Sequence, residues 1–503
     1  MASKIPSLRM GYEAAGTGRR LGNWQPGNDS VNALLFQDAD LIRARSRDLV
    51  RRNAWASNAI DSLQSNIVGT GIKPRPTVND EQLRDQIVTA WNRWTHEADA
   101  HGMLDFYGLQ SLAVRAMVEG GEVLVRLRNR LPSDGLSVPL QIQLLEPEHL
   151  PSSLNQTLPN GNIIRSGIEF DKIAQRTAYH LYREHPGERS LYGGFNSTPV
   201  PVPASEIIHM MKVGRPGQLR GEPWITQAII KLHELDQYDD AELVRKKAAA
   251  LIAGFIKTPA PEYATDNTVD DVDDYGVMNT VWTPGTLQVL REGEEITFSE
   301  PADVGGSYEP FMRFQLRAIA VAIGVTYEQL TGDLTGVNYS SIRAGMVEFR
   351  RRMEQLQQNV IIHQFCRPIF ARWMDQAVLS GALKIPGYVK NKHIYQSAKW
   401  IAQGWAWVDP QKEFNAVIMA IRSGLLSREA ALATYGFDAE EMDRVIAISN
   451  NRADRLGIIL DSDPRYRTKT GAAIPPDPSK KPAQQDAQTT PSTEGVSFSG
   501  EDF

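Results

Sequence analysis

The sequence predicts an α+β protein built from several subdomains. Between residues 122 and 182, short apolar or alternating stretches are separated by turn residues, which is typical of strands. On both sides of this region, apolar residues recur at helical spacing over longer segments. The chain has 503 residues, more than one ordinary hydrophobic core supports, so we expect several packed units.

The composition is that of a folded protein inside a cell. Apolar residues make up 42% of the chain and charged residues 23%, both usual for globular proteins. The single cysteine, Cys366, excludes an internal disulfide framework and suits a reducing cytoplasm. We also expect no membrane span and no signal peptide. The net charge of −6 argues against a surface that binds nucleic acid all over.

The first strongly periodic segment is rich in arginine. Residues 1–35 contain much Gly, Asn and Ser and predict a flexible arm. Residues 41–68 then carry apolar side chains at separations of seven, four and three, which predict a helix. The basic residues interleaved with them are Arg43, Arg45, Arg47, Arg51 and Arg52. They are candidates for contact with DNA or an acidic partner, or for a solvated or intersubunit ion-pair face, and the sequence favours neither.

Helices and strands alternate through the next part of the chain. Helices are expected over 81–97 and 107–117, and a Gly120-Gly121 turn leads into the strand region. The strands are expected over 122–127, 140–145, 163–170 and 178–182. From 222 to 256 the pattern predicts two helical pieces with a break near Asp236, and the second piece has a face of alanines that permits close helix packing.

An acidic segment follows. Residues 260–303 contain eleven acids and one base, Arg291, for a local charge of −10. The densest cluster comprises Asp270, Asp271, Asp273 and Asp274. Its spacing does not match a calcium-binding loop, so a solvated acidic loop is expected, with strands behind it over 277–296.

A polar loop between two helices is the most informative segment. Residues 310–323 predict an apolar helix that stops at Gly324, and a longer helix is expected from Ile342 to about Leu379, kinked at Pro368. Ser340 and Ser341 are expected to cap the longer helix. A structureless loop of this size inside a compact domain is uncommon and usually functional.

No catalytic constellation is evident. The chain has no Gly-rich loop ending in Gly-Lys-Ser/Thr, and its nine histidines lack the spacing of a zinc site. We therefore expect no enzymatic activity, no cofactor and no metal.

The loop and an ordered series of other motifs resemble the lambda-type portal proteins of tailed bacteriophages. The series includes GVTYEQLTGDLTGVNYSSIR (324–343), RPGQLRGEPW (215–224), WTPGTLQVLREGEEI (282–296) and WAWVDPQKEFNAVIMAIRSGLLS (405–427). The similarity runs from about residue 12 to 460, so it covers most of the chain.

The resemblance implies a subunit of a portal-type ring with wing, stem helices, clip, tunnel loop and helical crown. The implied divisions are an arm (1–35), a wing (36–236), a first stem helix (237–257), an acidic clip (258–308), a second stem helix (309–325), a tunnel loop (326–341), a long kinked helix with a return to the wing (342–408), a helical crown (409–462) and a disordered tail (463–503).

The resemblance also implies a channel that passes DNA. The residues implied to face DNA from the tunnel loop are Gly332, Asp333, Thr335, Gly336, Asn338, Tyr339 and Arg343, and the clip aspartates would meet the packaging motor. The implied partners are double-stranded DNA, further copies in a ring (usually a dodecamer), the terminase large subunit, major capsid and scaffold proteins, and head-completion proteins. The implied location is the host cytoplasm during assembly and then the capsid vertex. A DNA-processing enzyme and a monomeric capsid-assembly adaptor remain alternatives.

Overall fold

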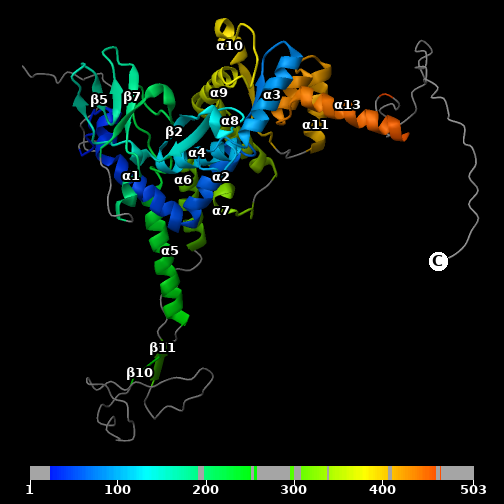
Figure 1. The fold of residues 1–503 in the computed structure, drawn as a ribbon. Coiled ribbons are helices and arrows are strands. Elements are labelled where there is room, and N and C mark those ends of the chain that lie inside the picture. The colour runs from blue at the N-terminus through cyan, green and yellow to red at the C-terminus, as the bar shows by residue number, and fades with distance from the viewer. Residues whose placement is uncertain are drawn as a thin grey trace, which may run out of the picture. The chain divides into compact units, whose positions relative to one another are not determined.

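The computed structural model describes residues 23–190, 198–250, 254–257, 295–298, 308–336, 339–405, 410–459 and 465. The described chain is a mixture of helices and antiparallel sheets, which confirms the predicted α+β class (Figure 1). Its contacts divide it into two units, Met1–Gly436 and Phe437–Phe503. Among the described residues, no helix combines the length and apolar character needed to cross a bilayer.

The first unit contains most of the helices. They are α1 (Val31–Arg52), α2 (Ala54–Ile67), α3 (Glu81–Thr95), α4 (Phe106–Gly120), α5 (Ile229–Ala250), α6 (Tyr308–Ile323), α7 (Tyr327–Thr331), α8 (Tyr339–Leu356), α9 (Arg367–Leu379), α10 (Lys392–Tyr395), α11 (Pro410–Arg422) and α12 (Arg428–Thr434). A π-helical segment, Gln357–Cys366, joins α8 to α9.

The described strands form four antiparallel sheets. Their bounds are β1 (Lys73–Pro76), β2 (Glu122–Asn129), β3 (Leu140–Leu145), β4 (Gln156–Thr157), β5 (Ile163–Arg165), β6 (Ile168–Phe170), β7 (Arg176–Leu181), β8 (Val200–Pro203), β9 (Ile207–Met211), β10 (Gly254–Lys257), β11 (Glu295–Phe298) and β12 (Ala398–Ile401). The sheet orders are β3-β2-β9, β4-β5-β6-β7-β8, β1-β12 and β10-β11.

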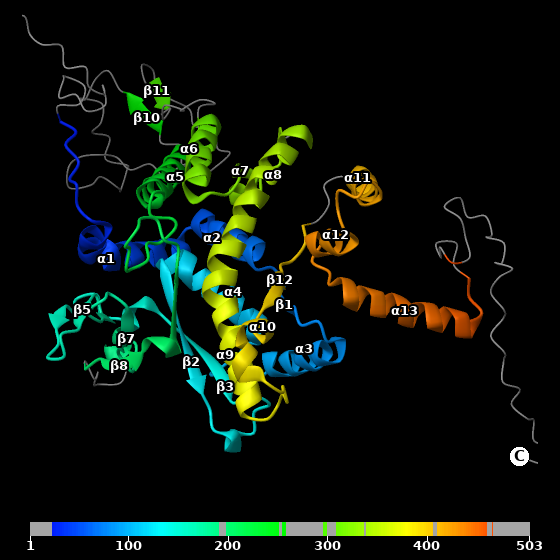
Figure 2. The ribbon, with the colours of Figure 1, turned by 90° about the horizontal axis from the view of Figure 1, so that it is seen from above.

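The main core is centred on aromatic side chains from helices far apart in the sequence. Trp91 of α3 lies with its ring centroid 4.9 Å from that of Phe106, 5.3 Å from that of Phe370 and 5.0 Å from that of Trp373. All four side chains are almost fully buried. Edge-to-face packing of this kind stabilises a core beyond the area that it buries, and here it fixes α9 against α3 and α4. Figure 2 shows α9 beside α4.

The arginine-rich segment forms two helices, and the prediction of one helix was wrong. Asn53 adopts an extended backbone between α1 and α2, and its Oδ1 accepts the N–H of Ala56 at 3.0 Å. This N-cap begins a new helix in the middle of the segment. Helix α1 also begins earlier than expected, at Val31, because the Ser30 side chain caps it within the predicted arm.

Two glycines allow distant backbone segments to touch. Gly121 ends α4 with φ +91°, and a Cβ added there would lie 2.6 Å from the carbonyl carbon of Glu222. A Cβ on Gly221 would lie 2.2 Å from the carbonyl oxygen of Gly121. Only glycine fits such close backbone approach, so the turn before β2 and the segment 220–223 pack directly on each other.

That contact places a buried carboxylate at the start of β2. Glu122 is fully buried, and Arg220 donates from Nε to its Oε1 at 2.7 Å. The Gly221 N–H donates to Oε2 at 2.6 Å, and His209 Nε2 lies 2.8 Å from the same oxygen. Arg43 of α1 lies 3.5 Å from Oε1 and donates from Nε to the Gly120 carbonyl at 3.0 Å. One side chain therefore joins α1, the α4–β2 turn, β9 and the segment before α5.

The electrostatics of this cluster follow from its burial and its partners. Burial opposes the charge on Glu122, but Arg220 and His209 outweigh it and hold the pKa of the carboxyl below its ordinary value. Burial lowers the pKa of His209, so its imidazole is neutral at pH 7. A neutral ring next to a carboxylate donates its proton, which assigns the N–H to Nε2.

Helix α5 differs from the prediction at both ends. It runs without a break through Asp236, whose carboxylate accepts from the Asn53 side-chain amide at 3.0 Å, so the expected break was wrong. It begins at Ile229 rather than near 237, and residues 254–257 of the predicted stem helix form strand β10, paired with β11. Tyr308 of α6 donates its hydroxyl to Asp239, which holds α6 beside α5.

Two other local predictions were wrong in detail. The expected strand 163–170 is a hairpin, because Ser166 and Gly167 have φ values of 48° and 83° and turn the chain between β5 and β6. The long helix departs from α geometry before Pro368: the π-helical segment ends at Cys366, and Pro368 lies in the first turn of α9. There its missing N–H costs little.

The second unit contains helix α13 (Ala439–Leu456), close to the predicted range. Asp438 caps it by accepting the N–H groups of Glu440 and Glu441 at 2.9 and 3.0 Å, and Gly457 ends it with φ +66°. Apart from Arg465, the residues of the predicted tail (463–503) lie outside the described ranges.

We predict that Glu122→Gln destabilises the fold by about 3–5 kcal/mol at pH 7, because Arg220 is then buried without a counter-charge among the described residues, whereas Arg43 keeps Asp40 and Glu148. The folded-state pKa of Glu122 lies below its unfolded value of 4.5, so this stabilisation is complete above about pH 4.5 and declines as the pH falls further. Denaturant unfolding at pH 7 and pH 4 measures both effects.

Glu184→Gln is the matched control, because Glu184 is exposed, and it should leave the free energy of unfolding unchanged. Equal stability of Glu122→Gln and the parent protein at pH 7 would contradict the assigned role of the carboxylate.

Candidate functional site

The predicted loop contains a short helix that the sequence analysis missed. Thr326 accepts the N–H of Gln329 at 3.2 Å, and the Gln329 side chain accepts the N–H of Thr326 at 3.0 Å. This reciprocal pair is a capping box, and it begins α7 inside the range 326–341 that was predicted to be a loop. Asn58 of α2 donates to the carbonyls of Gln329 and Leu330 at 2.7 and 2.8 Å and anchors the end of α7.

The described part of the loop that remains is a tight turn organised by Asp333. Gly332 ends α7 with φ +71°, and Gly336 has the same φ. The Asp333 carboxylate accepts the N–H and the hydroxyl of Thr335, with the N–H at 2.9 Å. It also accepts the Tyr327 hydroxyl at 3.0 Å and Arg313 Nη2 of α6 at 3.2 Å.

These bonds explain the ionisation of Asp333. The Thr335 hydroxyl and N–H, followed by the Tyr327 hydroxyl, lower the pKa of the carboxyl to about 2. The side chain therefore stays charged and the turn stays tied to α6 throughout the neutral and mildly acidic range. Arg313 and Tyr327 were not predicted as site residues, because no local spacing connects them to Asp333.

The other predicted DNA-facing residues, Asn338, Tyr339 and Arg343, follow this turn in the chain. Leu334 is 66% exposed at the turn, whereas Leu330 just before it is buried. Asn338 lies outside the described residues. Tyr339 begins α8, so Ser340 and Ser341 are inside the helix, and the prediction that they cap it from outside was wrong. Arg343 is exposed in the first turns of α8.

Comparison with known proteins identifies the family. The model of the phage portal proteins of the lambda family matches residues 17–357, which include α6, the Asp333 turn and α8. The chain belongs to this family. The matched residues cover about two thirds of the sequence.

Two relatives that match over most of their own length are named as portal proteins. A probable portal protein of Halomonas phage phiHAP-1 is 28% identical over 91% of this chain and 89% of its own length. Portal protein B of Escherichia phage lambda is 24% identical over 87% of this chain and 89% of its own length. Among solved structures, the neck of a native gene transfer agent particle aligns with a TM-score of 0.43 at 14% identity, over 78% of this chain and 93% of that one.

Within this portal-family chain, two of the predicted arginines form ion pairs inside the subunit. Arg43 is 1% exposed and contacts Glu122, Glu148 and Asp40, so the prediction that it contacts DNA or a neighbouring subunit was wrong. Arg47 donates to both oxygens of Glu148, at 2.6 and 3.2 Å. The helical pattern could not show this, because Glu148 is about a hundred residues away.

The other three arginines remain on the surface. Arg51 and Arg52 lie 2.6 and 2.9 Å from Asp48 of the same helix. Arg45 is exposed and has no ion-pair partner among the described residues. These three remain candidates for an external contact. The clip residues Asp270, Asp271, Asp273 and Asp274 lie outside the described ranges.

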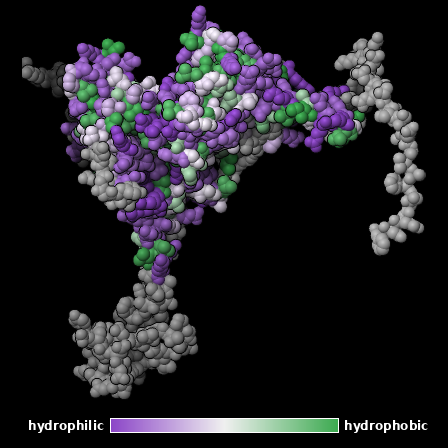
Figure 3. Space-filling model, viewed as in Figure 1, coloured by the Kyte–Doolittle hydropathy of each residue, from purple (hydrophilic) through white to green (hydrophobic). Residues whose placement is uncertain are grey.

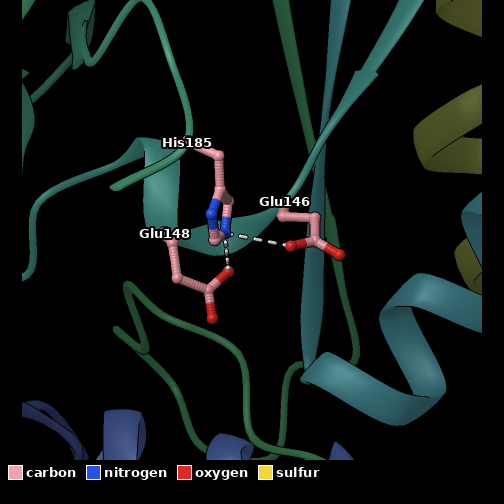
Figure 4. Close-up of side chains that lie close together, drawn as sticks. All are labelled: Glu146, Glu148 and His185. Atoms are coloured by element: carbon pink, nitrogen blue, oxygen red, sulfur yellow. Dashed lines mark ion pairs between the residues drawn. The ribbon is translucent and has the colours of Figure 1, made fainter. Parts of the chain in front are cut away.

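The structure also gathers a group of potential metal ligands that the sequence analysis did not identify. Glu146, Glu148 and His185 each place one ligand atom within 4.8 Å of the others, and His185 Nε2 lies 3.0 Å from Glu146 and 3.7 Å from Glu148 (Figure 4). Arg47 pairs with both carboxylates, so a cation would have to displace a guanidinium. We assign the group to the ion-pair network that joins α1 to the region after β3.

We predict that Asp333→Ala releases the turn without unfolding the subunit, because the half-buried carboxylate holds Thr335, Tyr327 and Arg313 at the surface and contributes nothing to the apolar core. Hydrogen exchange, measured by mass spectrometry on peptides that span 331–336, should become several-fold faster.

Glu328→Ala is the matched control, since no bond of its side chain is recorded among the described residues, and it should leave exchange in the turn unchanged. If Asp333→Ala exchanges like the parent protein, the carboxylate does not organise the turn.

Proposed function

We propose that this chain forms the ring-shaped portal through which phage DNA enters and leaves the capsid. The observation that carries the proposal is the family match, which runs continuously through α6, the Asp333 turn and α8. In such a ring, one surface of each subunit meets a different surface of the next, and the ring closes on itself. A dodecamer is the expected form.

Exposed apolar side chains on the helices around the turn support assembly. They are Ile230, Leu243 and Val244 on α5, Phe314 and Val321 on α6, and Val347 on α8. Phe314 is 69% exposed and Val321 78%. Large apolar groups on neighbouring helices favour burial against another protein surface, and further copies of the chain are the partner that a ring supplies.

The turn is suited to contact with moving DNA. Gly332, Asp333, Thr335 and Gly336, together with Asn338, Tyr339 and Arg343, make up the tunnel loop of the proposal. Asp333 is already paired with Arg313, so this turn offers passing phosphates no unpaired cation of its own. Strong phosphate contacts would hold DNA in place, whereas short polar groups permit it to slide.

The remaining partners and the location form part of the same proposal. The acidic segment 258–308 would dock the terminase large subunit through a basic surface, because complementary charge steers association. The wing would meet the major capsid and scaffold proteins, and head-completion proteins would bind after packaging. The protein would assemble in the host cytoplasm and remain at one vertex of the virion. The portal family is structural, and we propose that the chain has no catalytic activity.

We predict that Phe314→Glu weakens ring assembly and leaves the subunit folded, because the charge would be desolvated between subunits whereas the residue is exposed in the monomer. Mass photometry and circular dichroism together measure this. Ile173→Glu, on an exposed turn between β6 and β7, is the matched control and should assemble normally. Normal assembly of Phe314→Glu would place α6 outside the interface.

We predict that deletion of residues 333–336 allows rings to form but reduces packaging or retention of DNA. The deletion spares Leu330, which is buried and whose loss would disturb the core. The yield of DNA-filled particles, set against the yield of rings, checks this. Normal DNA-filled yield, or loss of the ring itself, would contradict the assigned role of the turn.

A further inference from the structure

A groove in the first unit lies along the free edge of strand β9. It has a volume of about 560 Å³, and its walls come from β7, β9, the π-helical segment and α9. Figures 1 and 2 both show β2, the neighbour of β9, between β7 and α9, and the outline of the surface is notched between these parts (Figure 3). The groove contains none of the residues assigned to the tunnel loop or the clip.

The backbone of β9 faces this groove with unused hydrogen-bonding groups. Among the described strands, β9 is at the edge of the β3-β2-β9 sheet and pairs with β2 alone. Met211 directs its N–H and carbonyl away from β2, because both bond to Gln364 instead. Backbone groups alternate in direction along an antiparallel strand, so those of His209, two residues earlier, also point away from β2. Ile207, Ile208 and His209 all line the groove. Because successive side chains of a strand point to opposite faces of the sheet, a groove that touches all three residues runs along the edge of the strand.

A side chain already mimics strand addition at one end of this edge. Gln364, in the π-helical segment, accepts the Met211 N–H at 2.9 Å and donates to the Met211 carbonyl at 3.0 Å. This pair of bonds is what a neighbouring strand would make. π-Helical insertions are frequent at functional sites, and this one positions the amide. Beyond Gln364, the N–H and carbonyl of His209 face the groove without a partner among the described residues, whereas the Ile207 N–H donates to the Ala204 carbonyl.

The charges in the groove favour an acidic ligand. Arg176 of β7 and Arg372 of α9 line it, and neither has an ion-pair partner among the described residues. Their recorded partners are neutral: Arg176 donates to the Tyr179 hydroxyl at 3.0 Å, and Arg372 Nη2 to the Asn129 side chain at 3.0 Å. Arg372 Nε is buried and has no hydrogen-bond partner in the part of the chain that the structure describes.

Asp375, the one acid among the described residues that line the groove, does not cancel these charges. Asp375 lies 2.7 Å from Lys392 Nζ and accepts the Tyr388 hydroxyl at 2.8 Å. Its charge is therefore already balanced. The two guanidiniums leave the groove with an excess of positive charge in a chain whose net charge is −6.

We propose that this groove binds an extended acidic peptide segment of another protein, which adds to β9 as a short strand and pairs its carboxylates with Arg176 and Arg372. Main-chain bonds to an exposed edge give affinity in this mode of recognition, and pockets beside the edge give specificity. Bidentate carboxylate binding suits the fork of donors on arginine. The inference is independent of the proposed channel function, because the groove residues are distinct from those of the channel.

The test is selection of a displayed library of short random peptides on the full chain, with counter-selection on Ala371→Trp, which fills the groove. Enriched peptides should be acidic and rich in β-branched residues. The enriched peptide should slow hydrogen exchange at the His209 amide, and its Kd should rise roughly tenfold or more in Arg176→Glu and in Arg372→Glu, since each loses a charge-assisted pair.

Arg165→Glu is the matched control, because Arg165 is an exposed arginine of the same sheet as Arg176 and lies outside the groove. It should leave the Kd unchanged. Circular dichroism of each variant separates loss of the groove from loss of the fold.

Four results would overturn the proposal: no enrichment, enrichment of basic peptides, enriched peptides whose Kd is insensitive to both arginine variants, and competition for the same site by a short DNA duplex with equal or greater affinity. The last result would assign the groove to a nucleic acid instead.

Discussion

The described fold of the first unit depends on one buried carboxylate. Glu122 holds two guanidiniums, an imidazole and a backbone N–H, and its partners come from three separate parts of the chain. Burying such a group is costly unless each charge is paired, so the network specifies a single arrangement of α1, β2, β9 and the segment before α5. The glycines at 121 and 221 make the arrangement possible by permitting backbone contact.

Local structure could be predicted well where sequence signals are local. The strand at 140–145 was predicted to the residue, and the helix at 310–323 to within two residues, because periodicity, proline and glycine mark their ends. Some missed features depend on distant partners or on rarer geometry, and others have local signals. The Asn53 cap, the capping box at Thr326 and the hairpin at Ser166 were present as sequence signals, yet the longer periodic patterns concealed them.

The candidate site was only partly predictable for the same reason. The sequence indicated a functional turn around Asp333, but not Arg313 and Tyr327, which hold its carboxylate. From the sequence, Arg43 and Arg47 were candidates for a contact surface. In the structure both pair with Glu148, which follows β3. A charged residue in an apolar helix indicates that a partner exists, and the sequence alone does not say whether that partner is inside the subunit.

In the proposed ring, the turn at 332–336 lines the central channel. A cryo-electron microscopy reconstruction of the purified full-length protein, prepared with a scaffold protein if it is monomeric alone, tests it most directly. We expect a hollow ring with this turn at the channel wall and α5 and α6 between subunits. A closed oligomer without a channel, or a ring with the turn on its outer surface, would contradict it.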